Sequence, residues 1–297
     1  STGGTNFLLY SLLILLLYDA DIDVILKTYV IVSGAIVLGV FVLSILGVIP
    51  NLQFAQVRSS VLVIRNSFGF IYPTDFASHC FYLFIAWGYI LRKRLIVLRT
   101  LVGLSLSFFI IKFCDARLNA LSVLLATVIF ILMYVTKERK FKIYGILPYS
   151  AAIFSSIMFY LTYFFTWSSS LFVSLNNLFS MRLFLGKNAI DTYDIHLFGT
   201  TGVKFIGYGG TTESVYSYNY VDSSYIQMLF YYGVVPVVLL VLIYVIASKR
   251  FYKQGMFLFL ALLSLITVNC MIEAFWVRPG YNIFMFALFA SLLPNQY

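Results

Sequence analysis

A single carboxylate stands where a long polar segment meets an apolar run. Asp222 closes a stretch rich in glycine and tyrosine, and the apolar segment 224–247 begins two residues later. Charged groups this close to a membrane are costly, and they usually face a bundle interior or a water-filled cavity. A carboxylate held in such a place can take part in proton transfer. Asp222 is therefore the first candidate for a catalytic group.

Several arginines could hold an anionic group. Arg58 and Arg65 are seven residues apart, so on a helix they would share a face. Arg117 stands at the start of an apolar run, two residues after Asp115. Guanidinium groups bind phosphate through paired hydrogen bonds and stay charged at a membrane surface. The alternatives are contacts of Arg58 and Arg65 with lipid headgroups, and a local ion pair between Arg117 and Asp115.

The composition places these residues in an integral membrane protein. Of the 297 residues, 62% are hydrophobic and 10% are charged, whereas ordinary soluble domains carry about 25% charge. The apolar residues form continuous runs, which indicates helices and not a barrel. Much of the net charge of +9 lies in short loops, so it does not indicate nucleic-acid binding.

Eight apolar segments are expected to cross the membrane, which makes residues 1–297 one all-α polytopic helix bundle. The polar residues 166–222 form one large loop within it. A partial run at 7–18 precedes the spans, and no signal peptide is recognisable at Ser1, so we expect the chain to lack an N-terminal portion. The expected spans are 29–49, 75–91, 100–113, 117–135, 143–165, 224–247, 256–272 and 281–293.

Basic residues predict the orientation of the bundle. Three short loops, 92–99, 137–142 and 249–253, carry clustered lysine and arginine on one side, which is therefore expected to be cytoplasmic. The opposite side carries Asp222 and the large loop. It also carries cations that the orientation does not require, and an anionic ligand at the outer leaflet is the simplest explanation for them. They are Arg58, Arg65, Arg117, Arg182, Lys187, Lys204 and Arg278. For Arg278 a surface pair with Glu273 is the alternative.

The large loop has the composition of a binding surface. Its first part, 171–185, is apolar enough for an interfacial helix, and glycines and tyrosines dominate the rest. Tyrosines stack on sugar rings while their hydroxyls form hydrogen bonds, so Tyr220 and Tyr225 beside Asp222 are candidate substrate contacts. The two histidines lie far apart and no nucleotide-binding or metal-binding pattern occurs, so we expect neither a metal nor a cofactor.

Together these motifs resemble the O-antigen ligase / Wzy polymerase family of bacterial membrane proteins. In that family a long external loop ends in His or Asp, then Asn, Ser or Gln, nine residues, and Gly. Asp222, Ser223 and Gly233 match this spacing. The segments 65–76 and 115–121 are similar to two further family motifs, although Ala116 replaces a small hydroxyl residue. The resemblance covers roughly residues 29–293, and an Asp where ligases commonly have His favours a polymerase.

The resemblance implies a GT-C-like fold and a metal-independent membrane glycosyltransferase. A polyprenyl-diphosphate-linked glycan would be the donor and a lipid-linked repeat unit the acceptor, on the outer face of the bacterial plasma membrane. The product would be a capsular, exo- or O-antigen polysaccharide. Asp222 would accept the proton of the acceptor hydroxyl or orient that hydroxyl, and Arg65 and Arg117 would meet the charge of the leaving diphosphate. The expected substrate contacts are Arg58, Arg182, Arg278, Tyr220 and Tyr225. Membrane lipids, a flippase and a chain-length regulator are the expected partners.

Other functions remain open. A ligase of the same family would use similar residues. A flippase or other transporter of lipid-linked oligosaccharide would also need a basic cavity, and a carboxylate could serve proton coupling there. Transporters often show internal repeats and interrupted helices, which are not evident in this sequence. A structural subunit would leave the outer cations unexplained.

Overall fold

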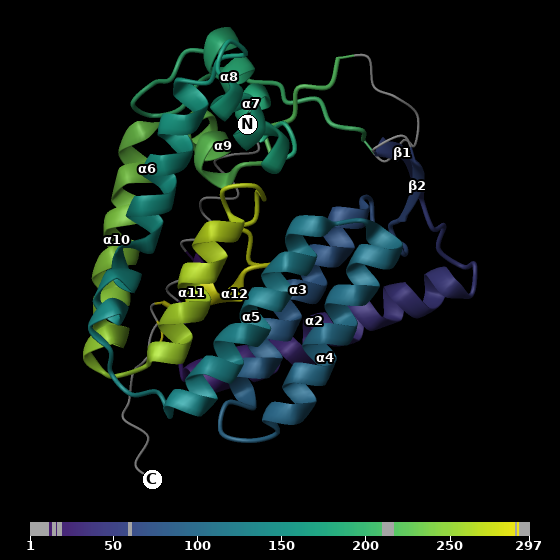
Figure 1. The fold of residues 1–297 in the computed structure, drawn as a ribbon. Helices are drawn as coiled ribbons and strands as arrows, with labels where there is room; N and C mark the ends of the chain where they lie inside the picture. Colours follow the sequence, from purple (N-terminus) through teal and green to yellow (C-terminus); the bar gives the residue numbers. More distant parts are fainter. Residues whose placement is uncertain are drawn as a thin grey trace.

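The chain folds into a mostly helical bundle (Figure 1). The computed structural model describes residues 12, 13, 16, 20–58, 61–209, 217–288 and 290. In that part, five helical segments are long and apolar enough to cross a membrane, so the chain is compatible with a multi-pass membrane protein. They are α2 (Ile22–Ile45), α4 (Ile96–Phe109) with a π-helical turn to Cys114, α5 (Arg117–Thr136), α6 (Ser150–Tyr163) with the preceding 3₁₀ turn Lys142–Tyr149, and α10 (Val234–Lys253).

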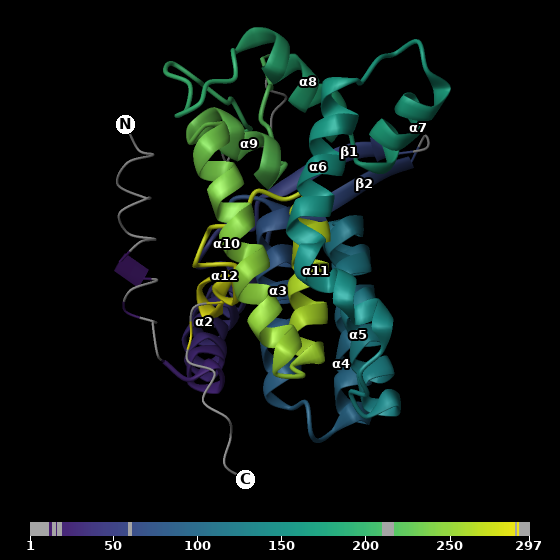
Figure 2. The same ribbon diagram turned by 90° about the vertical axis from the view of Figure 1, so that its left-hand side faces the viewer.

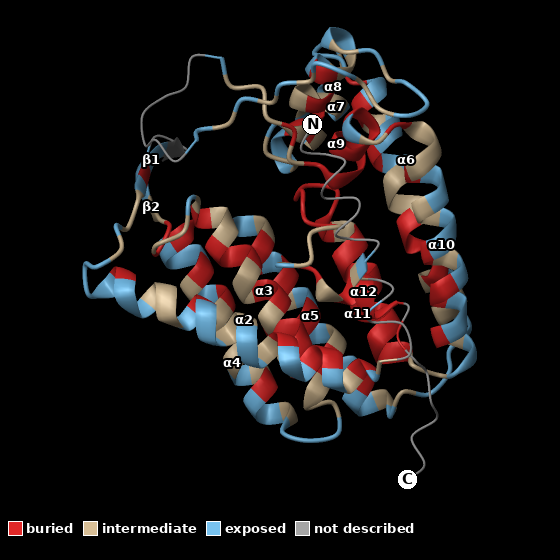
Figure 3. Cartoon of the chain, turned by 180° about the vertical axis from the view of Figure 1, so that it is seen from behind, coloured by how far each residue is buried: buried red, intermediate tan, exposed pale blue. Residues whose placement is uncertain are grey.

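Two further helices form the centre of the bundle. α3 (Pro73–Ile90) packs against α2 and α5, and α11 (Phe257–Asn269) packs against α5, α6 and α10. Nearly every residue of α11 is buried, as expected for a helix that is apolar on all sides (Figure 3). With 13 residues, α11 is about 20 Å long and shorter than the expected span 256–272. α12 (Ile283–Ala287) is a short helix, and most of the expected span 281–293 beyond it lies outside the described residues.

The outer helices expose apolar side chains along their length. On α2 these include Ile31 and Leu38, and on α10 Leu239 and Ile246 (Figure 3). Apolar surface of this extent is rare on soluble monomers and marks contact with a membrane or a partner. The exposed faces therefore fit contact with lipid.

The segment with Arg58 and Arg65 is a β-hairpin, so the expectation that a helix places them on one face is wrong. β1 (Gln53–Arg58) pairs antiparallel with β2 (Val61–Asn66), with Arg65 opposite Phe54 and Arg58 opposite Val61. Residues 61–64 are all aliphatic and include three β-branched side chains, which favour extended backbone. Figure 1 shows the hairpin on the side of the bundle away from α6 and α10, and Figure 2 shows it extending sideways at a lower level than α8.

The segment 166–222 contains two helices and not one interfacial helix. α7 (Ser170–Leu178) and α8 (Arg182–Thr192) are separated by Ser180 and Met181, whose backbones adopt positive φ values of 49° and 70°. The expected span 224–247 is also divided, because α9 (Ser224–Tyr231) ends before Gly233 and α10 begins at Val234. α8 and α9 both pack against α6.

Residues 196–200 are docked on the break between α9 and α10. The Thr200 N–H donates to the Phe230 carbonyl at 2.8 Å, and the Val234 N–H donates to the His196 carbonyl at 3.1 Å. The segment 196–200 and the break between α9 and α10 approach so closely because Gly199 and Gly233 face each other without side chains. This docking fixes the C-terminal end of α9.

The helices separate the basic turns from α7, α8 and α9. The turns that follow α3, α5 and α10 lie at the lower end of the bundle in Figure 1, and α7, α8 and α9 lie at the upper end. Lys and Arg cluster at this lower end, in residues 92–94 and 137–142 and in the last residues of α10, 249–253.

Candidate functional site

An ion pair between α8 and α9 forms the centre of the candidate site. Asp222 Oδ2 lies 3.0 Å from Arg182 Nη2, with side chains 22% and 17% exposed. Arg182 is the first residue of α8, and Asp222 immediately precedes Ser223, which occupies the N-cap position of α9. The pair therefore depends on how two helices of the segment 166–231 pack against α6.

Arg278 is a second arginine within electrostatic range of Asp222. Both arginines lower the pKa of Asp222 electrostatically, and Asp75 at the start of α3 lies within electrostatic range of Asp222 and Arg278. Arg278 Nη2 donates to the Tyr220 hydroxyl and to Gln227 Oε1, both at 3.4 Å. Of the residues predicted to bind substrate, the structure thus brings Arg182, Arg278 and Tyr220 to Asp222.

Burial has the larger effect on the protonation of Asp222. Loss of hydration raises the pKa of Asp222, and this outweighs the lowering by Arg182 and Arg278. A carboxylate with a raised pKa is a stronger base than one in water. The sequence left open whether desolvation of Asp222 outweighs the effect of the arginines on its pKa. In the structure the effect of desolvation is the larger one.

Glu273 is the residue that the sequence did not identify as part of this site. Its side chain is 5% exposed, so Glu273 is in the interior and not in a surface pair with Arg278. Oε1 accepts a hydrogen bond from Asn119 Nδ2 at 3.3 Å. Burial raises the pKa of Glu273 to about 8, Arg182 opposes this, and the carboxyl groups of Asp222 and Asp75 raise it further. Glu273 is therefore mostly protonated at pH 7.

A buried polar network supports Glu273 from within the bundle. Asn119 Nδ2 also lies 3.2 Å from Ser78 Oγ, and Asn269 Nδ2 donates to Ser122 Oγ at 3.1 Å. These side chains come from α3, α5 and α11, the three central helices. Buried polar networks that are largely satisfied fix one arrangement of the core. The network accordingly sets where the outer end of α11, and thus Glu273, lies.

The stability of the protein is expected to fall as the pH rises from 6 to 8. The folded state holds the Glu273 proton up to about pH 8, whereas the unfolded chain releases it near pH 4.3. Between these values the folded state binds more protons, so unfolding becomes easier by up to about 1.4 kcal/mol per pH unit. Glu273→Gln should flatten this slope in thermal unfolding midpoints measured in detergent, and Asp191→Asn should keep it. An unchanged slope in Glu273→Gln would contradict the assignment.

Arg65 and Arg117, the predicted catalytic arginines, belong to a separate group around residues 113–117. Arg65 Nε donates to the Cys114 carbonyl at 3.0 Å. Arg117 Nε lies 3.1 Å from Asp115 Oδ1, with the arginine side chain 61% exposed, so the local ion pair considered as the alternative is present. Neither arginine is among the groups that shift the pKa of Asp222. The side chain of Arg58 lies outside the described part of the structure.

Tyr225 is a core residue and does not face a ligand, contrary to its predicted role. It is 2% exposed, its hydroxyl donates to the Thr267 carbonyl at 2.7 Å, and its ring packs edge-on against Trp276. The first turn of α9 points this side chain into the bundle, while Asp222 before the helix remains partly open.

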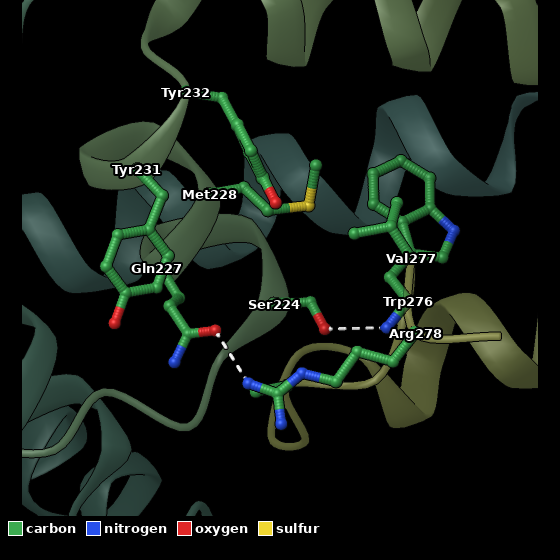
Figure 4. A pocket seen from close by; sticks show the side chains of 9 residues that line it. Ser224, Gln227, Met228, Tyr231, Tyr232, Trp276, Val277 and Arg278 are labelled. Carbon is green, nitrogen blue, oxygen red and sulfur yellow. Dashed lines mark hydrogen bonds between the residues drawn. The ribbon is translucent and has the colours of Figure 1, made fainter. Parts of the chain in front are cut away.

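A small cavity of about 70 Å³ lies beside Arg278, between α9 and the segment 274–278. Figure 4 shows Arg278 joined to Gln227 by a hydrogen bond, and Ser224 Oγ accepting one from the Trp276 N–H. The lining residues are Ser224, Gln227, Met228, Tyr231, Tyr232, Ala274, Trp276, Val277 and Arg278.

The spacing of the Asp222 motif corresponds to one helix. Ser223 occupies the N-cap position of α9, α9 ends at Tyr231, and Gly233 makes the break, so the nine residues between Ser223 and Gly233 span this short helix. An acidic residue directly after the expected span 256–272 was the signal for Glu273. Among the described residues, no group of three or more His, Cys, Asp or Glu side chains could hold a metal ion.

Comparison with protein-family models, with curated proteins and with solved structures gives no match for this chain.

Proposed function

We propose that the chain is a membrane glycosyltransferase that polymerises lipid-linked oligosaccharide repeat units. The observation that carries the proposal is the pairing of Asp222 with Arg182 at 3.0 Å, in a partly buried site that also contains Arg278 and Glu273. Transfer of a glycan from a diphosphate-linked donor to a hydroxyl requires a base and groups that stabilise the charge of the leaving diphosphate. Asp222, with its raised pKa, can supply the base, and the two arginines can supply the positive charge.

In the proposed reaction, the acceptor hydroxyl attacks the anomeric carbon of the donor glycan. A new C–O bond forms, the bond to the diphosphate breaks with its electron pair, and Asp222 takes the hydroxyl proton. Arg182 and Arg278 meet the charge of the leaving diphosphate, the role that the family resemblance implied chiefly for Arg65 and Arg117. Protonation of Asp222 weakens its hold on Arg182 just as the diphosphate develops charge.

The placement of charge supports an outward-facing site. The basic turns lie at one end of the bundle, and α8 and α9 lie at the other (Figure 1). Because clustered cations favour the cytoplasmic side, Asp222 faces outward in the proposed topology. That topology is the eight-span, GT-C-like arrangement in the bacterial plasma membrane, with residues 166–222 as its extracytoplasmic loop. The acceptor and donor are polyprenyl-diphosphate-linked oligosaccharides, as the sequence resemblance suggested, and a ligase of the same family is the alternative.

One observation favours a transporter as the second candidate. α9 and α10 together form an interrupted helix, broken at Gly233, and broken helices form the substrate sites of many transporters. The carboxylates near Asp222 would then couple transport to protons.

The experiment uses the purified chain in lipid vesicles with polyprenyl-diphosphate-linked repeat units. Wild type should produce a ladder of lengthened glycans, and Asp222→Asn should lose it while remaining folded. Asp191→Asn is the matched control, because Asp191 lies in the same loop, is 58% exposed, and pairs with Lys187 at 2.8 Å. A full ladder from Asp222→Asn would exclude Asp222 as the base. Movement of the repeat unit between leaflets without any ladder would favour the transporter.

A further inference from the structure

We propose that the cavity beside Arg278 binds the acetamido group of an N-acetylated sugar at the reacting position. This inference rests on the proposed function, and it adds the class of sugar that the enzyme selects.

The size of the cavity limits what it can hold. An apolar cavity of about 150 Å³ holds a benzene molecule. At about 70 Å³, this cavity has less than half that volume and is too small for a sugar ring. It fits a substituent of three or four heavy atoms. An acetamido group, with its methyl, carbonyl and nitrogen, is of this size.

The lining offers both kinds of contact that an acetamido group needs. Met228, Ala274 and Val277 supply apolar surface for the methyl. Gln227 and Arg278 lie on another side, joined through Gln227 Oε1 (Figure 4). A guanidinium has five N–H donors, so it can hold Gln227 and also donate to the acetamido carbonyl.

The position of the cavity connects it to the reacting atoms. Arg278 borders the cavity and also acts electrostatically on Asp222. Ser224 in the cavity wall is two residues after Asp222 in sequence. A group bound in the cavity therefore belongs to the sugar at Asp222 and not to a distant unit of the glycan. Filling the cavity would orient that sugar for reaction.

The test measures binding of three lipids to the full chain in nanodiscs. The probes are polyprenyl diphosphates that carry a 2-acetamido hexose, the unsubstituted hexose, or a 2-butanamido hexose. Wild type should bind the acetamido lipid at least about tenfold more tightly than the unsubstituted one, the smallest effect expected for a missing group in an apolar pocket. The butanamido lipid should bind no more tightly than the unsubstituted one, because its chain exceeds the cavity.

Two variants fill the cavity. Ala274→Leu and Val277→Phe should abolish the preference for the acetamido lipid over the unsubstituted lipid. Ala152→Leu on α6, outside the cavity, should retain the preference. Thermal unfolding of each variant shows that it is folded, and the second variant replaces the first if the first is not.

The outcomes separate this inference from the proposed function. Equal affinity of wild type for the acetamido and unsubstituted lipids overturns the cavity assignment alone, as does a preference that survives in both folded variants. If wild type binds none of the three lipids, the proposed function is overturned together with the assignment.

Discussion

Replacing Arg182 with methionine is expected to reduce polymerisation by about 10²–10³-fold, the loss typical of a removed charge-stabilising donor. The same change should destabilise the protein, because Asp222 would lose its ion-pair partner in a site where both side chains are less than a quarter exposed. Loss of one partner of a buried ion pair costs about 3–5 kcal/mol. The initial rate of ladder formation and the thermal unfolding midpoint measure the two effects.

A double variant separates the catalytic from the structural effect of Arg182. Arg182→Met with Asp222→Asn removes both charges, so most of the lost stability should return while activity stays absent. Lys187→Met is the control, because it removes an exposed i,i+4 pair with Asp191 that is worth about 0.3–0.5 kcal/mol. Full activity in folded Arg182→Met would show that the guanidinium does not assist the leaving group, and Arg278 alone would then have to supply that charge.

The long apolar helices were the part of the fold best predicted from sequence. The expected span 117–135 coincides with α5 (Arg117–Thr136), because charged or polar residues bound the apolar run at both ends. Hydrophobicity alone does not reveal where a helix ends inside an apolar run. α11 therefore proved shorter than its span, and the run 224–247 proved to contain a break. The hairpin was missed because the spacing of Arg58 and Arg65 was interpreted on a helix, although the aliphatic and largely β-branched run 61–64 favours extended backbone.

The candidate site was only partly predictable, for a related reason. Asp222 was identified from its place at the end of a polar segment, but its partners depend on how helices pack. Arg182 begins a helix that lies against α6, whereas Arg65 and Arg117 lie near the hairpin and the turn at 113–117. Sequence shows which residues are charged, and it cannot show which of them share a buried site. Glu273 illustrates this, because its raised pKa results from burial, and the sequence does not show that Glu273 is buried.

Replacing Gly233 with alanine is expected to cost at least about 3 kcal/mol, and it would disturb the site without altering any of its charged groups. Gly233 has φ +91°, where a side chain is strained by about 1–3 kcal/mol. A Cβ there would also come within 3 Å of backbone atoms of Leu197, Phe198 and Gly199. These atoms belong to the docked segment and cannot move without breaking its hydrogen bonds to the break between α9 and α10.

Because α9 joins this break to Asp222, Gly233→Ala should lower both the unfolding midpoint and the rate of polymerisation. The matched control is Gly280→Ala, since a Cβ at Gly280 meets nothing within 4 Å. Restored activity at low temperature, where the variant remains folded, would show that the docking stabilises the fold without positioning Asp222. A rate that stays low in the folded variant would show that the docked segment sets the geometry of the ion pair between Asp222 and Arg182. Asp222 and Gly233 stand at opposite ends of α9. The need for glycine at position 233 would then be explained by packing. Only a residue without a side chain lets the segment 196–200 dock at one end of α9, and this docking would position Asp222 at the other end.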